Sequence, residues 1–280
     1  MIILKTVESL TRQLAYYKEA GCSIGFVPTM GALHDGHISL LRTAQQKADI
    51  TVCSIFVNPT QFNDPEDFKK YPVTTDQDIA LLIAEKVDVL FLPEPNEVYP
   101  KDLALKQYDL GEIEFLLEGA HRPGHFQGVA QVLDRLLNII QPTFIIMGQK
   151  DFQQVMIVKR LLDLTRQPTK LISSPTLREP SGLARSSRNT RLTPEERQKA
   201  AAIHSTLLFG KEHIIQESPR VLENTMSNQL LSAGFKAIDY VSICHSQTLL
   251  PIEQYKPGMD VVILIAAFIG EVRLIDNMKI

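Results

Sequence analysis

The chain has 280 residues, 44% of them hydrophobic and 22% charged, with a formal net charge of −3 at pH 7. This balance provides no broad basic surface, so we expect no binding to nucleic acid or to an anionic membrane. The longest apolar run, residues 261–269, is too short to span a bilayer, and the apolar start before Lys5 is too short for a signal peptide. Three widely spaced cysteines are typical of free thiols, so we expect a cytoplasmic protein.

Strand-like and helix-like stretches alternate through the first part of the chain. Short apolar runs rich in β-branched and aromatic residues predict strands at 24–27, 50–57, 87–92, 144–147 and 170–173. Helical patterns lie between them, at 37–48, 75–85, 128–140 and 151–164. Strands that alternate with helices predict a parallel sheet with helices on both faces, which is an α/β, Rossmann-like domain.

The character of the chain changes after residue 173. A loop at 177–192 carries four arginines, and Thr193, Pro194 and Glu196 then form the capping-box pattern of a helix start. Two helices are predicted up to about residue 234, followed by strands at 237–244, 261–268 and 271–275. We therefore predict two domains, residues 1–176 and a smaller α+β domain at 177–280, with the arginine-rich loop as a candidate closing lid.

The segment 26–38 combines a strand end, a Gly-containing turn and two histidines at a helix start. Such a helix start presents unpaired N–H groups and the positive end of the helix dipole to an anion, and Gly36 lets the backbone approach a ligand closely. His34 and His37, three residues apart, fall on the same side of the first turn and can donate to triphosphate oxygens. This pattern predicts nucleotidyl transfer, although it also occurs by chance, and a zinc site would need a third ligand.

Polar motifs follow two further predicted strands, at 58–62 and 148–151. Because ligands bind beyond the carboxyl ends of parallel strands, we expect these motifs and the histidines to converge on one crevice. Asn58 before proline is commonly a turn residue. In a site, neutral amides such as Gln61 and Gln154 would orient a substrate carboxylate without tying up its lone pairs in an ion pair.

Cationic and hydroxyl groups are the other candidates for phosphate binding. Lys150 would act as a point charge for phosphate and Asp151 would accept from ribose hydroxyls, although a helix start explains both residues equally well. Ser186, Ser187 and Arg188 form either a clamp for the β- and γ-phosphates or a solvated loop. A Gly/Pro/His loop at 118–126 is expected to line the same crevice. Asp76 and Asp78 are explained as carboxylates at a helix N-terminus.

The chain resembles the pantoate–β-alanine ligase family within the His-x-Gly-His nucleotidyltransferase superfamily. The resemblance spans about residues 26–192 and rests on five stretches, FVPTMGALHDGH, SIFVNPTQF, LEGAHRPGHFQGV, GQKDFQQ and SSRN. It implies that (R)-pantoate and β-alanine condense to pantothenate, with ATP converted to AMP and pyrophosphate through a pantoyl adenylate. It also implies a homodimer with a C-terminal lid domain and Mg²⁺ carried mainly by ATP, with no metal ligand assigned in the protein.

The resemblance assigns catalysis to His34, His37 and Lys150, with His37 as proton donor. The implied ATP site consists of Met30, Gly31, Ala32, Leu33, His34, Asp35, Gly36, His37, Gly148, Gln149, Lys150, Asp151, Leu177, Arg185, Ser186, Ser187 and Arg188. The implied substrate site consists of Gln61 for pantoate and β-alanine, Gln154 for pantoate, and Asn58, Pro28 and Phe62.

Three positions depart from the family pattern. Arg185 replaces a Met or Leu, Val73 replaces an Arg, and Gln77 precedes Asp78 where some members have a metal-associated acidic pair. Two alternatives stay open. A nucleotidyltransferase that adenylates a phosphate acceptor would explain the histidines without the neutral amides, and a nucleotide-sensing module would bind ATP without turnover.

Overall fold

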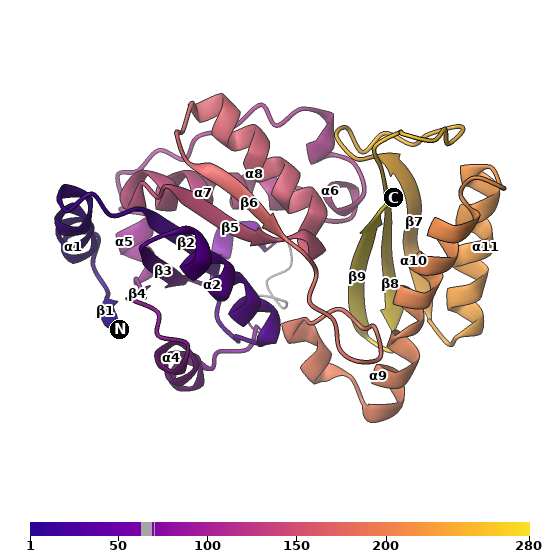
Figure 1. Ribbon diagram of the computed structural model, residues 1–280, viewed down its shortest axis with the longest axis horizontal. Helices are drawn as coiled ribbons and strands as arrows, with labels where there is room; N and C mark the ends of the chain where they lie inside the picture. Colours follow the sequence, from indigo (N-terminus) through magenta and orange to yellow (C-terminus); the bar gives the residue numbers. More distant parts are fainter. Residues whose placement is uncertain (63–68, 70) are drawn as a thin grey trace. The chain divides into compact units, whose positions relative to one another are not determined.

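The computed structural model describes residues 1–62, 69 and 71–280 (Figure 1). The chain divides into two compact units. The first consists of Met1–Gly148 and Gln153–Pro175, and the second consists of Gln149–Phe152 and Thr176–Ile280. The short segment Gln149–Phe152 therefore leaves the first unit and packs with the residues that follow Pro175.

A parallel sheet forms the centre of the first unit, as predicted, and it has six strands. The strand order is β1-β4-β3-β2-β5-β6. The strands are β1 (Ile2–Leu4), β2 (Ile24–Thr29), β3 (Ile50–Ile55), β4 (Val89–Phe91), β5 (Phe144–Gly148) and β6 (Lys170–Ser174). The sequence pattern did not predict β1, because its three residues are largely exposed at the sheet edge and show no alternation of burial.

Helices cover both faces of this sheet (Figure 1). One face packs against α1 (Val7–Glu19), α7 (His125–Ile140) and α8 (Phe152–Thr165), and the other against α2 (Asp35–Lys47) and α4 (Thr75–Ala84). Successive strand residues point to opposite faces, so Phe26 packs in the first layer and Val27 in the second. Strands buried on both faces, such as β3 and β4, are typical of α/β proteins.

Helix boundaries differ from the prediction at two places that matter for the site. The pattern that predicted one helix from 151 begins with the 3₁₀ turn η3 (Gln149–Asp151), and α8 starts at Phe152. Helix α7 starts at His125 because Gly124, with φ of 79°, turns the chain into it. The remaining short elements are η1 (Pro59–Gln61), α5 (Pro95–Val98), η2 (Glu112–Glu114) and α6 (Glu118–His121).

The second unit is a three-stranded antiparallel sheet with helices on one face. Its strands are β7 (Ala237–His245), β8 (Val261–Ile269) and β9 (Val272–Lys279), and its helices are η4 (Ser187–Arg191), α9 (Pro194–Ala200), α10 (Ala202–His213) and α11 (Pro219–Ser232). The predicted capping box is present, since Thr193 Oγ1 accepts from Glu196 N at 3.2 Å and Glu196 Oε2 from Thr193 N at 2.9 Å. Strand β9 continues four residues beyond its predicted end at 275, to Lys279. None of the described helices has the length and apolar character that crossing a membrane requires.

Candidate active site

The carboxyl ends of β2 and β3 carry two of the predicted motifs side by side. The two strands are neighbours, with Thr29 opposite Ile55, and the strand order reverses between β2 and β5. In parallel sheets this reversal creates the crevice in which ligands bind. Met30 follows β2 and Gln61 lies after β3, and Gln61 Nε2 donates to Met30 Sδ at 3.0 Å. The third motif, Gln149–Asp151, belongs to the second unit, so its convergence with these two stays a prediction.

The two predicted histidines form a reciprocal cap at the start of α2. His34 Nδ1 accepts from Gly36 N at 3.1 Å, and His37 Nδ1 accepts from His34 N at 3.3 Å. The ring centroids are 4.1 Å apart. Because each Nδ1 accepts a hydrogen bond, this pattern assigns the proton of each neutral ring to Nε2. The start of the helix therefore carries two Nε2–H donors on adjacent rings.

Asp78 holds the turn that precedes these histidines. Its carboxylate, in the first turn of α4, is 2% exposed and accepts from Ala32 N at 2.9 Å, Leu33 N at 2.8 Å and Thr74 Oγ1 at 3.1 Å. The turn needs such support because Gly31 and Ala32 both have positive φ, 82° and 50°. Our interpretation of Asp78 as a helix-start carboxylate is therefore incomplete, because the same group also fixes the loop leading into α2.

Gln61 is buried and oriented by Asn58. Asn58, 1% exposed, donates from Nδ2 to Gln61 Oε1 at 3.1 Å and to Gly128 O at 3.1 Å. Its Oδ1 accepts from Tyr99 Oη at 3.0 Å and from Thr60 N at 3.4 Å, which caps η1. Both ends of the Asn58 amide are thus used within the protein. Asn58 serves the turn, as the simpler interpretation predicted, and also positions the Gln61 amide.

The Gly/Pro/His loop at 118–126 lies against the backbone of Gln61. His125 Nδ1 donates to Gln61 O at 2.7 Å, and its Nε2 lies 3.3 Å from Arg122 Nη1. Helix α7 approaches η1 so closely that a Cβ at Gly128 would lie 2.3 Å from Thr60 O. Only glycine allows this approach. The position of Gln61 is therefore fixed from its side chain and its backbone.

The other predicted substrate contacts are partly exposed. Pro28 lies in β2, and Phe62 contacts Tyr71 edge to face, with ring centroids 5.8 Å apart. Gln154 lies in the first part of α8, and its side chain makes no hydrogen bond to any residue that the structure describes. Its amide therefore has both donor and acceptor capacity for a ligand.

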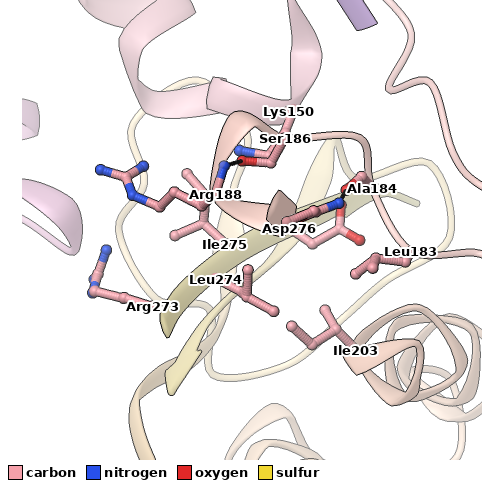
Figure 2. Close-up of a pocket in the computed structure, with 11 residues that line it drawn as sticks. Lys150, Leu183, Ala184, Ser186, Arg188, Ile203, Arg273, Leu274, Ile275 and Asp276 are labelled. Carbon is pink, nitrogen blue, oxygen red and sulfur yellow. Dashed lines mark hydrogen bonds between the residues drawn. The ribbon is translucent and has the colours of Figure 1, made fainter. Parts of the chain in front are cut away.

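A pocket of the second unit contains three of the predicted phosphate-binding residues. Lys150, Ser186 and Arg188 line it, together with residues of β9 (Figure 2). The Lys150 side chain is 16% exposed, with Nζ 3.6 Å from Asp151 Oδ1. Ser186 Oγ accepts from Arg188 N at 3.3 Å and caps η4. Leu177 and Ser187 are not among the described residues that line this pocket, and Leu177 is 38% exposed.

The three departures from the family pattern have different surroundings. Val73 is 76% exposed and Gln77 is exposed, so neither lies in a packed site. Arg185 Nη1 lies 3.8 Å from Glu179 Oε1, and its backbone N donates to Leu177 O at 2.9 Å. Glu179 also accepts two hydrogen bonds from Arg197, so Arg185 lies near a carboxylate that is already paired.

The Glu179 ion pairs predict a pH-dependent contribution to stability. Hydrogen bonds from Arg197, with the charges of Arg197 and Arg185, hold the pKa of Glu179 below its ordinary value of 4.5. This contribution is therefore complete above pH 4.5 and is lost as the pH falls through the lower folded-state pKa. We expect Glu179→Gln to lower the unfolding free energy at pH 7 by about 1 kcal/mol, since Arg197 is partly exposed. Urea unfolding at pH 7 and at about pH 3.5 should show a smaller difference at the acid pH, and an equal difference at both would contradict the assignment.

Comparisons with known proteins match this chain to one family of enzymes. The family model described as pantoate-beta-alanine ligase matches residues 2–279. The pantothenate synthetase of Cytophaga hutchinsonii is 42% identical over 282 residues, which cover 100% of this chain and 99% of the relative. That of Leptospira interrogans serovar Lai is 42% identical over 285 residues, covering 100% and 98%.

Two solved structures share the whole fold. The pantothenate synthetase of Thermus thermophilus superimposes with a TM-score of 0.92 at 39% identity, covering 100% of this chain and 99% of that one. The Francisella tularensis pantoate-beta-alanine ligase, complexed with beta-gamma ATP and beta-alanine, gives a TM-score of 0.82 at 38% identity, with 100% and 97% covered.

Proposed function

Because the chain belongs to the pantoate–β-alanine ligase family, we propose that it joins its substrates through a pantoyl-adenylate intermediate formed from ATP. The enzyme is a ligase of pantothenate biosynthesis. In the proposed route the carboxylate of (R)-pantoate attacks the α-phosphorus of ATP and releases pyrophosphate. The amine of β-alanine then attacks the acyl carbon and releases AMP. Activation is needed because a carboxylate oxygen is a poor leaving group, and the protein supplies positioning and charge stabilisation.

The imidazole pair of α2 is the observation that carries this proposal. Two Nε2–H groups on rings 4.1 Å apart stand at a helix N-terminus, where the helix dipole also favours negative charge. We assign His34 and His37 to the phosphate oxygens, with His37 as the donor to the charge that develops on the α-phosphate. Asp78 keeps both rings in place by holding the preceding turn.

Gln61 is proposed to bind pantoate in the first step and β-alanine in the second. Its amide is neutral and already oriented by Asn58, so it holds the carboxylate without removing its nucleophilicity. Gln154 offers a second amide to pantoate. The proposed apolar wall for the gem-dimethyl group consists of Pro28, Met30 and Phe62. Asn58 acts here through Gln61 rather than by direct contact, because its polar atoms are taken internally.

Three residues that line the pocket of the second unit have side chains suited to phosphate. Lys150 supplies a point charge, and Arg188 with Ser186 supplies a planar cation and a hydroxyl. Asp151 is exposed and suits ribose hydroxyls. The further residues proposed for the ATP site are Gly31, Ala32, Leu33, Asp35, Gly36, Gly148, Gln149, Leu177, Arg185 and Ser187.

Mg²⁺ is proposed to enter with ATP. We assign no protein ligand to it, because Gln77 precedes Asp78 where some members of the family have a metal-associated acidic pair. The remaining proposals, a homodimer and a cytoplasmic location, rest on the family resemblance and on the free, widely spaced cysteines. Sedimentation of the purified enzyme measures the first.

Pyrophosphate–ATP exchange tests the adenylate route directly. We expect label from pyrophosphate to enter ATP only when pantoate is present. The exchange should not need β-alanine, because it requires only that the first step run in both directions. Phosphorus NMR of the complete reaction should show AMP and pyrophosphate in equal amounts. Exchange that proceeds without pantoate, or that requires β-alanine, would contradict the two-step order.

A further inference from the structure

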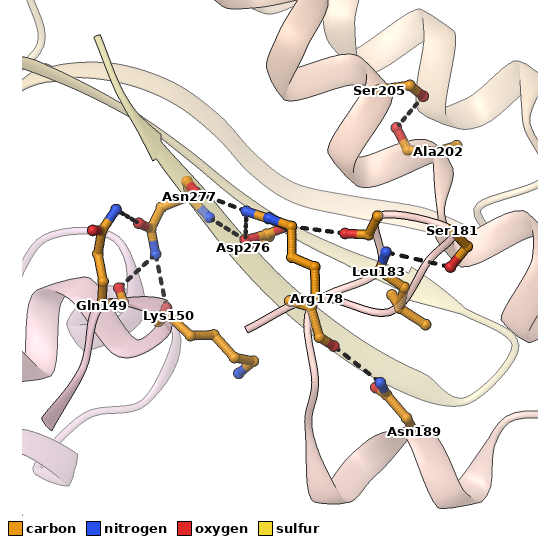
Figure 3. Close-up of polar contacts among 12 residues, drawn as sticks. Gln149, Lys150, Arg178, Ser181, Leu183, Asn189, Ala202, Ser205, Asp276 and Asn277 are labelled. Carbon is orange, nitrogen blue, oxygen red and sulfur yellow. Dashed lines mark hydrogen bonds and ion pairs between the residues drawn. The ribbon is translucent and has the colours of Figure 1, made fainter. Parts of the chain in front are cut away.

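Two consecutive buried polar residues of β9 pair with groups outside the second unit's sheet. Asn277 is 2% exposed and Asp276 is 4% exposed. Consecutive strand residues point to opposite faces, so Asn277 lies against the turn η3 and Asp276 against Arg178 (Figure 3). Burying a polar group costs free energy unless the group is hydrogen-bonded, so the partners of Asn277 and Asp276 show what holds each side chain in place.

Asn277 binds the backbone of η3 at two successive residues. Its Nδ2 donates to Gln149 O at 2.9 Å and to Lys150 O at 2.8 Å, which uses both amide hydrogens. Its Oδ1 accepts from Gln149 Nε2 at 3.4 Å. A three-residue 3₁₀ turn makes few hydrogen bonds of its own, so one side chain that binds two of its carbonyls fixes its conformation.

Asn277 is itself held rigidly. It lies in the β8–β9 ladder opposite Leu264, and its backbone N donates to Asp276 Oδ1 at 2.8 Å. The Asp276 carboxylate in turn receives both terminal nitrogens of Arg178, and Arg178 Nη1 also donates to Gly182 O at 3.0 Å. A bidentate guanidinium–carboxylate pair fixes direction as well as distance. The end of β9 is therefore a rigid support for η3.

We infer that Asn277 is a positioning residue for Lys150 in the ligase reaction. The inference rests on the proposed role of Lys150 in binding the phosphates of ATP. The Lys150 side chain is only 16% exposed, with Nζ 3.6 Å from Asp151 Oδ1, so the place of its ammonium group depends on the backbone of η3. When η3 moves, the ammonium group moves with it, and small displacements of a charged group cost much of its effect on a reacting phosphate.

A double-mutant cycle in the complete enzyme tests this role. In pyrophosphate–ATP exchange we expect Asn277→Ala to lower kcat/KM for ATP by about 10–100-fold. In the Lys150→Met background the same substitution should change kcat/KM less than about twofold, because there is no ammonium group left to position. A merely structural role would give the same loss in both backgrounds, and that result would overturn the inference.

Two further variants distinguish a loss of stability or folding from a loss of positioning. Leu222→Ala removes a fully buried side chain from the core of the second unit, so it should lower the melting temperature yet keep kcat/KM for ATP. Asn277→Asp keeps the side-chain size but replaces Nδ2 by an acceptor, and it should repeat the loss if Asn277→Ala does not fold. Full activity of Lys150→Met would refute the proposed function of Lys150. If Lys150→Met is impaired and Asn277→Ala is fully active, only the positioning role is refuted.

Discussion

Adenylate formation by the His37→Ala variant is expected to be about 10²–10³ times slower than in the unchanged enzyme, which is the usual cost of losing one donor to developing charge. The substitution removes the Nε2–H that we assign to the α-phosphate. It also removes the Nδ1 that accepts from His34 N, so His34 loses part of its orientation. Both effects act on the first chemical step, and single-turnover formation of pantoyl adenylate measures that step without interference from amide formation.

The fold should survive this substitution, because His37 lies at a helix start and its loss costs about 1 kcal/mol of capping. His213→Ala is a matched control. That histidine also lies at a helix end, where its ring stacks on Phe209 and its Nδ1 contacts Phe209 O at 2.9 Å. We expect His213→Ala to leave adenylate formation unchanged. A His37→Ala enzyme that forms adenylate at the normal rate would show that the assigned role is wrong.

The parallel sheet, and the prediction that polar motifs meet at the carboxyl ends of its strands, follow from patterns that a sequence displays locally. Apolar runs and helical periods reflect burial on one or both faces, so they predicted five of the six parallel strands. The rule that ligands bind at carboxyl ends also predicts that the histidines and Gln61 lie near one another, and the described contact there joins Gln61 Nε2 to Met30 Sδ, four residues before His34.

The supporting residues were not predictable, because their partners are far away in the chain. Asp78 binds backbone groups 45 and 46 residues earlier, and a helix start explains an aspartate at that position without them. Asp276 and Asn277 interrupt the apolar pattern of β9, so that pattern predicts a strand end at 275, whereas both residues are buried by pairing with Arg178 and η3. Buried polar residues that serve tertiary contacts resemble solvent-exposed ones in sequence.

Asp78→Ala is expected to slow adenylate formation by about 10–100-fold, although residue 78 contacts no substrate in the proposed site. The substitution leaves the N–H groups of Ala32 and Leu33 without their buried acceptor, which costs about 1–3 kcal/mol for each. Ala32 has a φ of 50°, which is unfavourable for a residue other than glycine, so the turn relaxes once the carboxylate is gone. His34 follows this turn directly, and the imidazole pair loses its position.

Asp76 provides the matched control for this effect, because it lies in the same first turn of α4 but is exposed. Asp76→Ala removes only a favourable charge near the helix N-terminus, worth about 0.5 kcal/mol, and should leave adenylate formation unchanged. Measuring the rate of each variant against Mg²⁺ concentration distinguishes positioning from metal binding. A positioning role predicts a lower maximal rate of Asp78→Ala at an unchanged Mg²⁺ requirement. If Asp78 bound the cation instead, high Mg²⁺ would restore the rate, and the hydrogen bonds to Ala32 and Leu33 would then be incidental to catalysis.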